Sequence, residues 1–110
     1  MLRLVSRSQI LVVGLGPAGI DRLSTRVLRM LEEPERRVIV RTVDHPACRE
    51  LADRRSVYPC DDLYEAAGSF DEVYSSIAER VVAAAADGPV AYAVPGSAVV
   101  GERAVGEIRK

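Results

Sequence analysis

The sequence predicts one α/β domain built in three layers, an open and mostly parallel sheet with flanking helices on both faces. Short apolar runs rich in β-branched residues alternate with stretches whose apolar residues recur at helical spacing. Loops that contain Gly and Pro follow two of those runs directly, at 14–19 and 94–97, which is typical of the carboxyl ends of parallel strands. With 110 residues and 48% hydrophobic content, residues 1–110 are expected to bury a single core and form one domain.

Four segments are expected to form strands, because each is short and is bounded by turn-forming residues. They are Ile10 to Val13, Val38 to Thr42, the shorter Ser56 to Tyr58, and Val90 to Val94. The first and the last are continuous apolar runs rather than alternating ones. Strands that are buried on both faces show this composition, which favours a sheet covered by helices on either side.

The first two predicted helices follow the first two strands. Ser24 is expected to cap the first helix, which ends before Pro34. Its buried face would consist of Val27, Leu28 and Leu31. Asp44 is expected to cap the second helix, with Pro46 in its first turn. The inner side of that helix would carry Cys48, Leu51 and Ala52.

Two further helices are predicted before the last strand. Asp61 and Asp62 would open a brief helical turn that runs through Ala67. Ser69 and Glu72 form the capping-box pattern at the start of a longer helix, which Gly88 ends. The apolar face of the longer helix would comprise Phe70, Val73, Ile77, Val81 and Ala85.

A helical pattern begins again after Gly96 and stops at Lys110 without a C-cap, so the protein is expected to continue beyond this segment. The apolar positions of this pattern are Val99, Val100, Val105 and Ile108. A second half of the protein would cover that face, and an apolar patch left exposed drives association. We therefore expect a homo-oligomer, with the Gly96 loop at or near the contact.

The charge balance argues against nucleic acid and membranes as partners. Lys and Arg number 15 and Asp and Glu number 16, and the two signs are interspersed along the chain.

No segment approaches the roughly 20 apolar residues of a membrane-spanning helix. The first residues also lack the apolar stretch of a signal peptide. The sequence thus predicts a cytoplasmic protein.

Several residues with reactive side chains have structural interpretations. Cys48 and Cys60 match no common metal-ligand spacing and are expected to be reduced, structural thiols. His45 directly precedes Pro46 and is expected to serve at a helix start rather than in catalysis. The four tyrosines would place their rings in the core and their hydroxyls at the surface. The acids between 61 and 72 suit helix starts better than a cation, so no metal site and no catalytic residue is assigned.

Glycines at 14, 16 and 19 also fit the G-x-G-x-x-G pattern of a dinucleotide-binding loop. Two features weigh against that interpretation. Asp21 follows at once and would repel a pyrophosphate at the helix N-terminus. The second strand should end in a ribose-binding acid at its carboxyl edge, but this chain has Arg41-Thr42-Val43-Asp44 there, with a base first and the acid better used as a helix cap. A Rossmann-type domain is therefore kept as an alternative of lower rank.

The order of several motifs along the chain is similar to that of a known family. The first loop carries Gly14, Gly16 and Pro17, followed by Ala18, Gly19, Ile20, Leu23 and Ser24. Later come Arg41-Thr42 with His45-Pro46, then Phe70-Asp71-Glu72-Val73-Tyr74, and then Tyr92-Ala93-Val94-Pro95-Gly96. From Ile10 to Val105 the chain resembles the N-terminal half of the tetrapyrrole (corrin/porphyrin) methylase family. The closer resemblance is to the subclass fused to a MazG nucleotide pyrophosphohydrolase domain.

This resemblance implies that S-adenosylmethionine binds in a cleft between two α/β halves, against the backbone of the loop after the fourth strand. The residues it implies in that site are Gly96 above all, with Val94, Pro95, Ser97 and Val100 beside it, and Pro17 toward the methyl group or the acceptor. Where the family usually has Gly-Asp-Pro, this chain has Gly96-Ser97-Ala98. Three classes of function stay open: a methyltransferase with an unknown acceptor, a sensor that binds the cofactor without turnover, and a dimerisation scaffold for the fused hydrolase.

Overall fold

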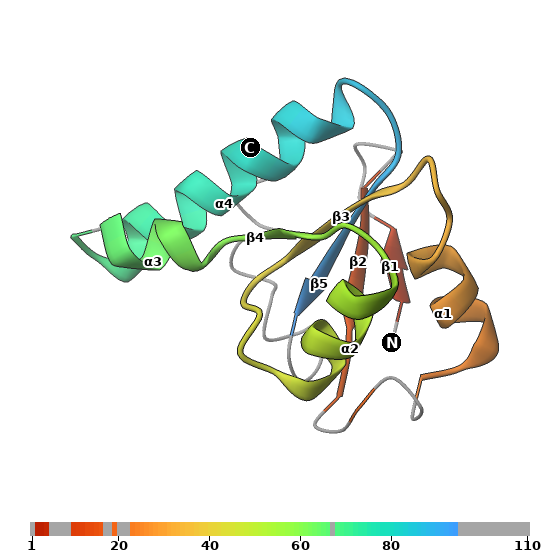
Figure 1. The fold of residues 1–110 in the computed structure, drawn as a ribbon. Helices are drawn as coiled ribbons and strands as arrows, with labels where there is room; N and C mark the ends of the chain where they lie inside the picture. The colour runs from red at the N-terminus through yellow and green to blue at the C-terminus, as the bar shows by residue number, and fades with distance from the viewer. Residues whose placement is uncertain (1, 5–9, 17–18, 20–22, 67, 95–110) are drawn as a thin grey trace.

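The computed structural model describes residues 2–4, 10–16, 19, 23–66 and 68–94, which contain one five-stranded sheet (Figure 1). The strands are β1 (Leu2–Leu4), β2 (Ile10–Gly14), β3 (Arg37–Val40), β4 (Tyr58–Pro59) and β5 (Val90–Val94). Strands β2, β5, β3 and β4 are parallel, and β1 pairs with β2 in the antiparallel direction. The mostly parallel sheet is thus confirmed. Strand β1 is an addition to the expected set, because three residues are too few to show a period.

The order of strands across the sheet is β1-β2-β5-β3-β4, so the last strand in the sequence lies between two earlier ones. Strand β5 pairs with β2 on one side and with β3 on the other. Just past the ends of these strands, the N–H of Leu15 donates to the Val94 carbonyl at 2.9 Å and the N–H of Arg41 donates to the Ala93 carbonyl at 3.0 Å. The ends of β2, β5 and β3 therefore lie side by side at one edge of the sheet, here called the carboxyl edge.

In the described part of the chain, four helices cover the sheet. They are α1 (Thr25–Leu31), α2 (Pro46–Arg54), α3 (Asp61–Ala66) and α4 (Phe70–Ala85). Helices α1 and α2 pack on one face and α4 packs on the other, with α3 beside α4 (Figure 1). The three-layer α/β architecture is confirmed. None of the described helices is long and apolar enough to cross a membrane.

Each face of the sheet buries its own apolar cluster, because successive side chains of a strand point to opposite faces. The cluster toward α4 comprises Ile10, Val12, Ile39, Cys60, Val73, Ile77, Ala78, Val81, Ala84, Val90, Tyr92 and Val94. The cluster toward α1 and α2 comprises Leu11, Val13, Leu15, Val27, Leu31, Val38, Val40, Ala47, Cys48, Leu51, Ala91 and Ala93. Every residue of β2 and β5 is buried, as a sheet covered on both faces requires.

Two of the predicted helix caps are confirmed. The Ser24 hydroxyl accepts a hydrogen bond from the N–H of Val27 at 3.2 Å, and α1 begins at the next residue. The Ser69 hydroxyl accepts from the N–H of Glu72 at 3.2 Å. The Glu72 carboxylate in turn accepts from the N–H of Gly68 at 2.8 Å, one residue before the cap. The capping box of α4 is therefore closed on the residue that precedes Ser69.

The expected cap of α2 is wrong. Pro46 occupies the first position of that helix, so the N-cap is the residue directly before it, which is His45 and not Asp44. The inner side of α2 is also shifted, since Ala52 is exposed and Ala47 is buried in its place.

The expected position of Phe70 in the core is wrong as well. Its side chain is 69% exposed. Phe70 is the first residue of α4, at the end of the helix that extends past the sheet beside α3 (Figure 1). The sheet therefore offers no surface on which this ring could pack, although Val73, one turn later, is buried.

The guanidinium of Arg55 joins three segments by donating to backbone carbonyls. Its acceptors are the carbonyls of Leu31 at 3.0 Å, Glu33 at 2.8 Å, Arg36 at 2.6 Å and Ser56 at 3.0 Å. Leu31 ends α1, and Arg36 directly precedes β3. Carbonyls at a helix end lack partners within the helix, so Arg55 supplies donors where the chain turns from α1 into the sheet.

We predict that Arg55→Lys lowers the free energy of unfolding by about 2 kcal/mol, because an ammonium cannot reproduce the fork of donors that a guanidinium provides. Arg54→Lys is the matched control. Arg54 is half exposed and makes one ion pair, to Glu32 at 3.3 Å, so its replacement should cost less than about 0.5 kcal/mol. Urea unfolding of both variants measures the difference, and equal losses would contradict this role of Arg55.

Candidate functional site

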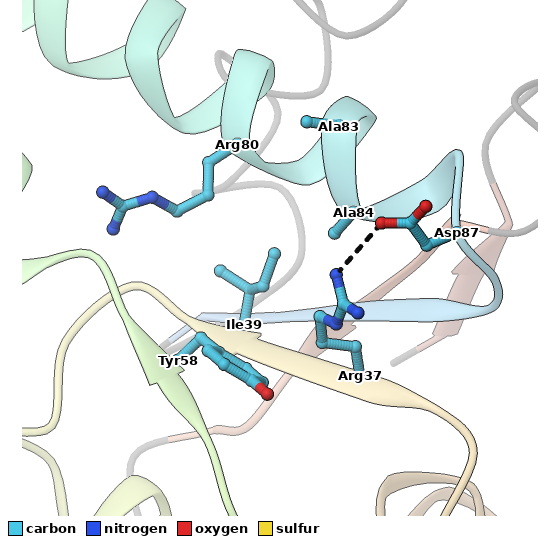
Figure 2. A pocket seen from close by; sticks show the side chains of 7 residues that line it. All are labelled: Arg37, Ile39, Tyr58, Arg80, Ala83, Ala84 and Asp87. Carbon is cyan, nitrogen blue, oxygen red and sulfur yellow. Dashed lines mark ion pairs between the residues drawn. The ribbon is translucent and has the colours of Figure 1, made fainter.

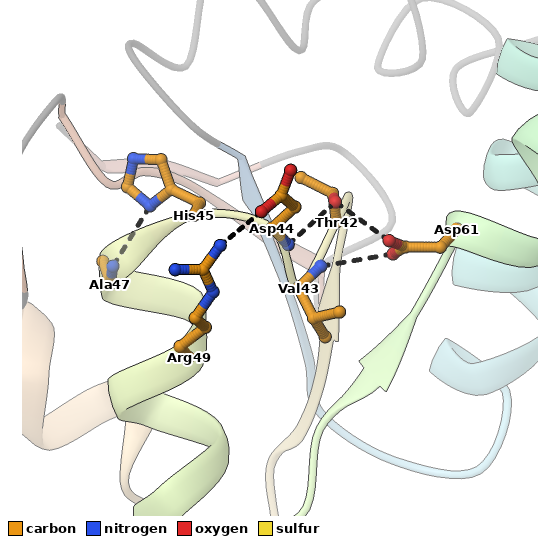
Figure 3. Close-up of polar contacts among 7 residues, drawn as sticks. All are labelled: Thr42, Val43, Asp44, His45, Ala47, Arg49 and Asp61. Atoms are coloured by element: carbon orange, nitrogen blue, oxygen red, sulfur yellow. Dashed lines mark hydrogen bonds and ion pairs between the residues drawn. The ribbon is translucent and has the colours of Figure 1, made fainter.

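The carboxyl edge of the sheet gathers polar groups that belong to distant parts of the sequence. Asp61, the first residue of α3, accepts hydrogen bonds from the Thr42 hydroxyl at 3.0 Å and from the N–H of Val43 at 3.2 Å (Figure 3). The Thr42 hydroxyl accepts in turn from the N–H of Asp44 at 3.0 Å. The two oxygens of the Asp61 carboxylate are thus both engaged, and they hold the turn after β3 against the start of α3.

His45 connects the start of α2 to the first glycine loop. Its Nδ1 accepts from the N–H of Ala47 at 3.2 Å, so a neutral ring carries its proton on Nε2 (Figure 3). That nitrogen lies 3.1 Å from the carbonyl oxygen of Gly16 and donates to it. The predicted role of His45 at a helix start is confirmed, and the contact with Gly16 adds a second one. Asp44, freed from capping, pairs with Arg49.

Gly16 is the residue of the first loop at which the backbone requires glycine. Its φ is +72°, in the left-handed region that side chains with a Cβ rarely adopt. A Cβ placed there would meet no described atom within 4 Å. The glycine is therefore needed for the conformation of the turn and not to avoid a clash with a described residue.

A pocket of about 340 Å³ opens at the same edge, between the turn after β3 and helix α3. Its lining residues are Arg41, Thr42, Asp61, Tyr64 and Glu65. The Tyr64 hydroxyl is buried without a hydrogen-bond partner among the described residues. Sequence reasoning gave Asp61 and Glu65 only helix-start roles and Arg41 none, although polar residues directly after a buried strand are the signal that would have found this pocket.

Two tyrosine hydroxyls depart from the expected surface position. The Tyr92 side chain is fully buried at the centre of the sheet, and its hydroxyl, like that of Tyr64, has no partner in the described part of the chain. Tyr92 occupies an inward position of β5, so its ring lies under α4 and its hydroxyl cannot reach water. Burial raises the pKa of both phenols above the usual value, so both are protonated donors at neutral pH.

A second pocket, of about 390 Å³, lies between α4 and the β3–β4 edge of the sheet (Figure 2). Its charged residues already have partners. Arg37 pairs with Asp87 at 3.8 Å and lies 5.8 Å from the centre of the Tyr58 ring. Arg80 donates to both oxygens of Asp62, at 2.9 and 2.8 Å. Such internal pairing leaves few groups in this pocket for a ligand.

The sequence-predicted cofactor residues fall mainly outside the described residues: Pro17, Pro95, Gly96, Ser97 and Val100 are not among them, and neither are Val99 and Val105. Val94 is described. Its side chain is fully buried in the cluster under α4, and its carbonyl accepts from the N–H of Leu15. What the structure does bring together is the start of the loop after β2 and the end of β5, from which the expected site would extend.

Both cysteines are free and buried, on opposite faces of the sheet. Burial raises the pKa of the Cys48 thiol to about 11 and that of the Cys60 thiol to about 11. Each is therefore a neutral thiol at physiological pH, which removes the thiolate needed for nucleophilic or metal chemistry. Among the described residues, no group of three or more His, Cys, Asp and Glu side chains could hold a metal ion.

The raised pKa values of the two thiols predict that the protein loses stability in alkaline solution. The ordinary thiol pKa is 9.0 and the folded values are about 11, so the unfolded chain releases protons that the folded chain retains. The free energy of unfolding keeps its full value below pH 9. It falls as the pH rises from 9 to 11, by up to about 2–3 kcal/mol for each thiol. Urea unfolding in reductant at several pH values measures it. The double variant Cys48→Ala/Cys60→Ala should lose less free energy of unfolding between pH 9 and pH 11. If the variant and the parent chain lose the same amount, the two thiols are not the cause.

The chain is similar to the uncharacterized protein YabN of Bacillus subtilis (strain 168), with 38% identity over 98 residues. The matched region is 88% of this chain but only 20% of YabN, so the chain spans about a fifth of the length of the curated relative it matches. No family model matches the chain, and no solved structure matches it. The comparison thus relates this parallel α/β domain to part of a longer protein.

Proposed function

We propose that the chain is an S-adenosylmethionine-binding subdomain of the tetrapyrrole-methylase type, from a protein that also carries a MazG pyrophosphohydrolase domain. The motif order along the sequence and the parallel α/β sheet both support this assignment. The similarity to one fifth of YabN supports a place within a larger protein. Methyl transfer and pyrophosphate hydrolysis would then be properties of that larger protein.

The observation that carries the proposal is the position of β5 beside β2. The hydrogen bond of 2.9 Å between Leu15 and Val94 brings the loop after β2 to the start of the loop after β5. In open α/β sheets, ligands bind outside the carboxyl ends of the strands. The chain runs from β2 to β3 and β4 by way of α1 and α2 on one face and returns to β5 by way of α4 on the other, which places the carboxyl ends of β2 and β5 next to each other.

The residues at this edge have the properties that a cofactor loop needs. Gly16 adopts a positive φ, and no described atom lies within 4 Å of the position that its Cβ would take. Gly96 would let the backbone approach an adenosine or a methionyl group closely, with Pro95, Ser97 and Val100 beside it and Pro17 on the side of the acceptor. Val94 would serve by anchoring the loop, because its side chain is packed in the core.

The cofactor itself supplies an activated methyl group on a sulfonium, so the protein would act chiefly by positioning the acceptor. We assign no catalytic residue. The sequence Gly96-Ser97-Ala98 lacks the acid that the family usually has at this loop, and this feature favours a second candidate function, cofactor sensing without turnover.

We predict weak, saturable binding of S-adenosylmethionine by the 110-residue chain, measured by titration calorimetry, because a cleft between two halves offers only part of its contacts here. Gly96→Val should abolish the binding by adding a side chain where the backbone must approach the ligand. Gly68→Ala is the matched control, since its Cβ would meet only the flexible Glu72 carboxylate, 3.3 Å away.

Three outcomes would contradict the proposal. One is the absence of any heat of binding, which would favour a scaffold that binds nothing. Another is equal binding by Gly96→Val and the parent chain, which would place the site elsewhere. The third is a rise in melting temperature with NAD, NADP or FAD but none with S-adenosylmethionine, which would support the dinucleotide alternative.

A further inference from the structure

The pocket lined by Arg41, Thr42, Asp61, Tyr64 and Glu65 contains opposite charges that are not paired with each other. Within the described part of the chain, neither the Arg41 guanidinium nor the Glu65 carboxylate forms an ion pair or a side-chain hydrogen bond. The second pocket behaves differently, because its two arginines are paired with Asp87 and Asp62. Among the described residues, Arg41 is therefore a cation and Glu65 an anion without a partner, and both are available to a ligand.

Asp61 adds an anion whose position is fixed. Its two oxygens accept from the Thr42 hydroxyl and from the N–H of Val43, and these bonds orient the carboxylate. A carboxylate has about four acceptor positions, so each oxygen can accept once more from a ligand. The pocket therefore combines the preorganised carboxylate of Asp61 with the charges of Arg41 and Glu65.

The hydroxyl of Tyr64 supplies a donor without a partner. It is buried, protonated and unsatisfied among the described residues, and its side chain lines the pocket. A buried polar group that lacks a hydrogen bond destabilises the protein, so a ligand oxygen that accepted from it would gain that energy. The fully buried Tyr92 hydroxyl is a second donor without a partner among the described residues.

The charges select the class of ligand. A phosphate would be attracted by Arg41 but repelled by Asp61 and Glu65, and a simple cation would be attracted by the two acids but repelled by Arg41. A ligand that carries one positive and one negative group can satisfy both sets. The volume of about 340 Å³ limits it to a small molecule or to the end of a larger one.

We propose that this pocket binds a small zwitterion of the α-amino-acid type. Its carboxylate lies against Arg41, its ammonium group lies against Asp61 and Glu65, and the Tyr64 side chain turns its buried hydroxyl onto the carboxylate. This inference goes beyond the proposed cofactor function and does not depend on it. It concerns the turn after β3 and helix α3, whereas the cofactor loop follows β5.

The test is an NMR titration of the 110-residue chain with four probes: L-alanine, acetate, methylammonium and inorganic phosphate. L-Alanine should give saturable shifts at the amides of Thr42, Tyr64 and Glu65. Acetate, methylammonium and phosphate, which each carry one sign of charge, should bind at least ten-fold more weakly. The proposal is wrong if L-alanine gives no saturable shift, or if any of the other three binds as well as it does.

Two charge-neutral variants locate the site. Arg41→Gln and Glu65→Gln should each weaken L-alanine binding at least ten-fold. The matched controls are Arg26→Gln and Glu79→Gln, which neutralise exposed residues of α1 and α4 outside the pocket and should leave the affinity unchanged. Glu65 is itself exposed, so its variant should keep the fold even if Arg41→Gln does not. Unchanged affinity in Glu65→Gln would overturn the proposal.

Tyr64→Phe separates a ligand-binding hydroxyl from a structural one. Because the hydroxyl has no described partner, its removal should leave the unfolding midpoint unchanged or raise it. The same variant should weaken L-alanine binding several-fold. A loss of stability with unaltered binding would show that the hydroxyl serves the fold and not a ligand. This result, like those of the charge variants, is independent of S-adenosylmethionine binding, which is tested at Gly96.

Discussion

The insertion of β5 between β2 and β3 is the constraint on which the rest of this structure depends. Every residue of β5 is buried, and its backbone pairs with a neighbour on each side. A parallel strand in such a position must be covered on both faces, which requires α4 on one side and α1 with α2 on the other. The two apolar clusters are separate for this reason, and the small Ala91 and Ala93 face one helix layer while the large Tyr92 faces the other.

The same insertion of β5 also forms the carboxyl edge of the sheet, where both proposed sites lie. Backbone bonds from Leu15 and Arg41 to carbonyls of β5 bring three strand ends together, and the side chains that directly follow β3, Arg41 and Thr42, are polar. Asp61 then joins the turn after β3 to α3, and His45 joins α2 to Gly16. These contacts hold the walls of the pocket and the turn of the first loop in fixed positions. A rigid rim around an open space is a general property of ligand sites on α/β sheets.

Periodicity and turn residues predicted the α/β class, the four parallel strands and all four described helices, because each of these signals is local. These signals gave wrong predictions where the position of a residue in the folded protein determines its burial or its capping role. Phe70 fits the apolar face of α4 by spacing, but the helix extends past the sheet at that point. Asp44 is a good capping residue, yet Pro46 assigns the cap to His45. The pocket at Arg41 and Tyr64 is predictable only in part: the polar residues directly after β3 indicate one wall, but the proximity of α3 follows from strand order, which no local pattern encodes.

The measurement that tests this account most directly is the set of interstrand nuclear Overhauser effects in the isotopically labelled chain. The strand order β2-β5-β3 predicts contacts from backbone protons of Tyr92 to those of Val12 on one side and of Ile39 on the other. It also predicts slow hydrogen exchange at the amides of Leu15 and Arg41, which donate to carbonyls of β5. Direct contacts between β2 and β3, with rapid exchange at those two amides, would contradict the order of strands and with it the shared edge on which both proposed sites depend.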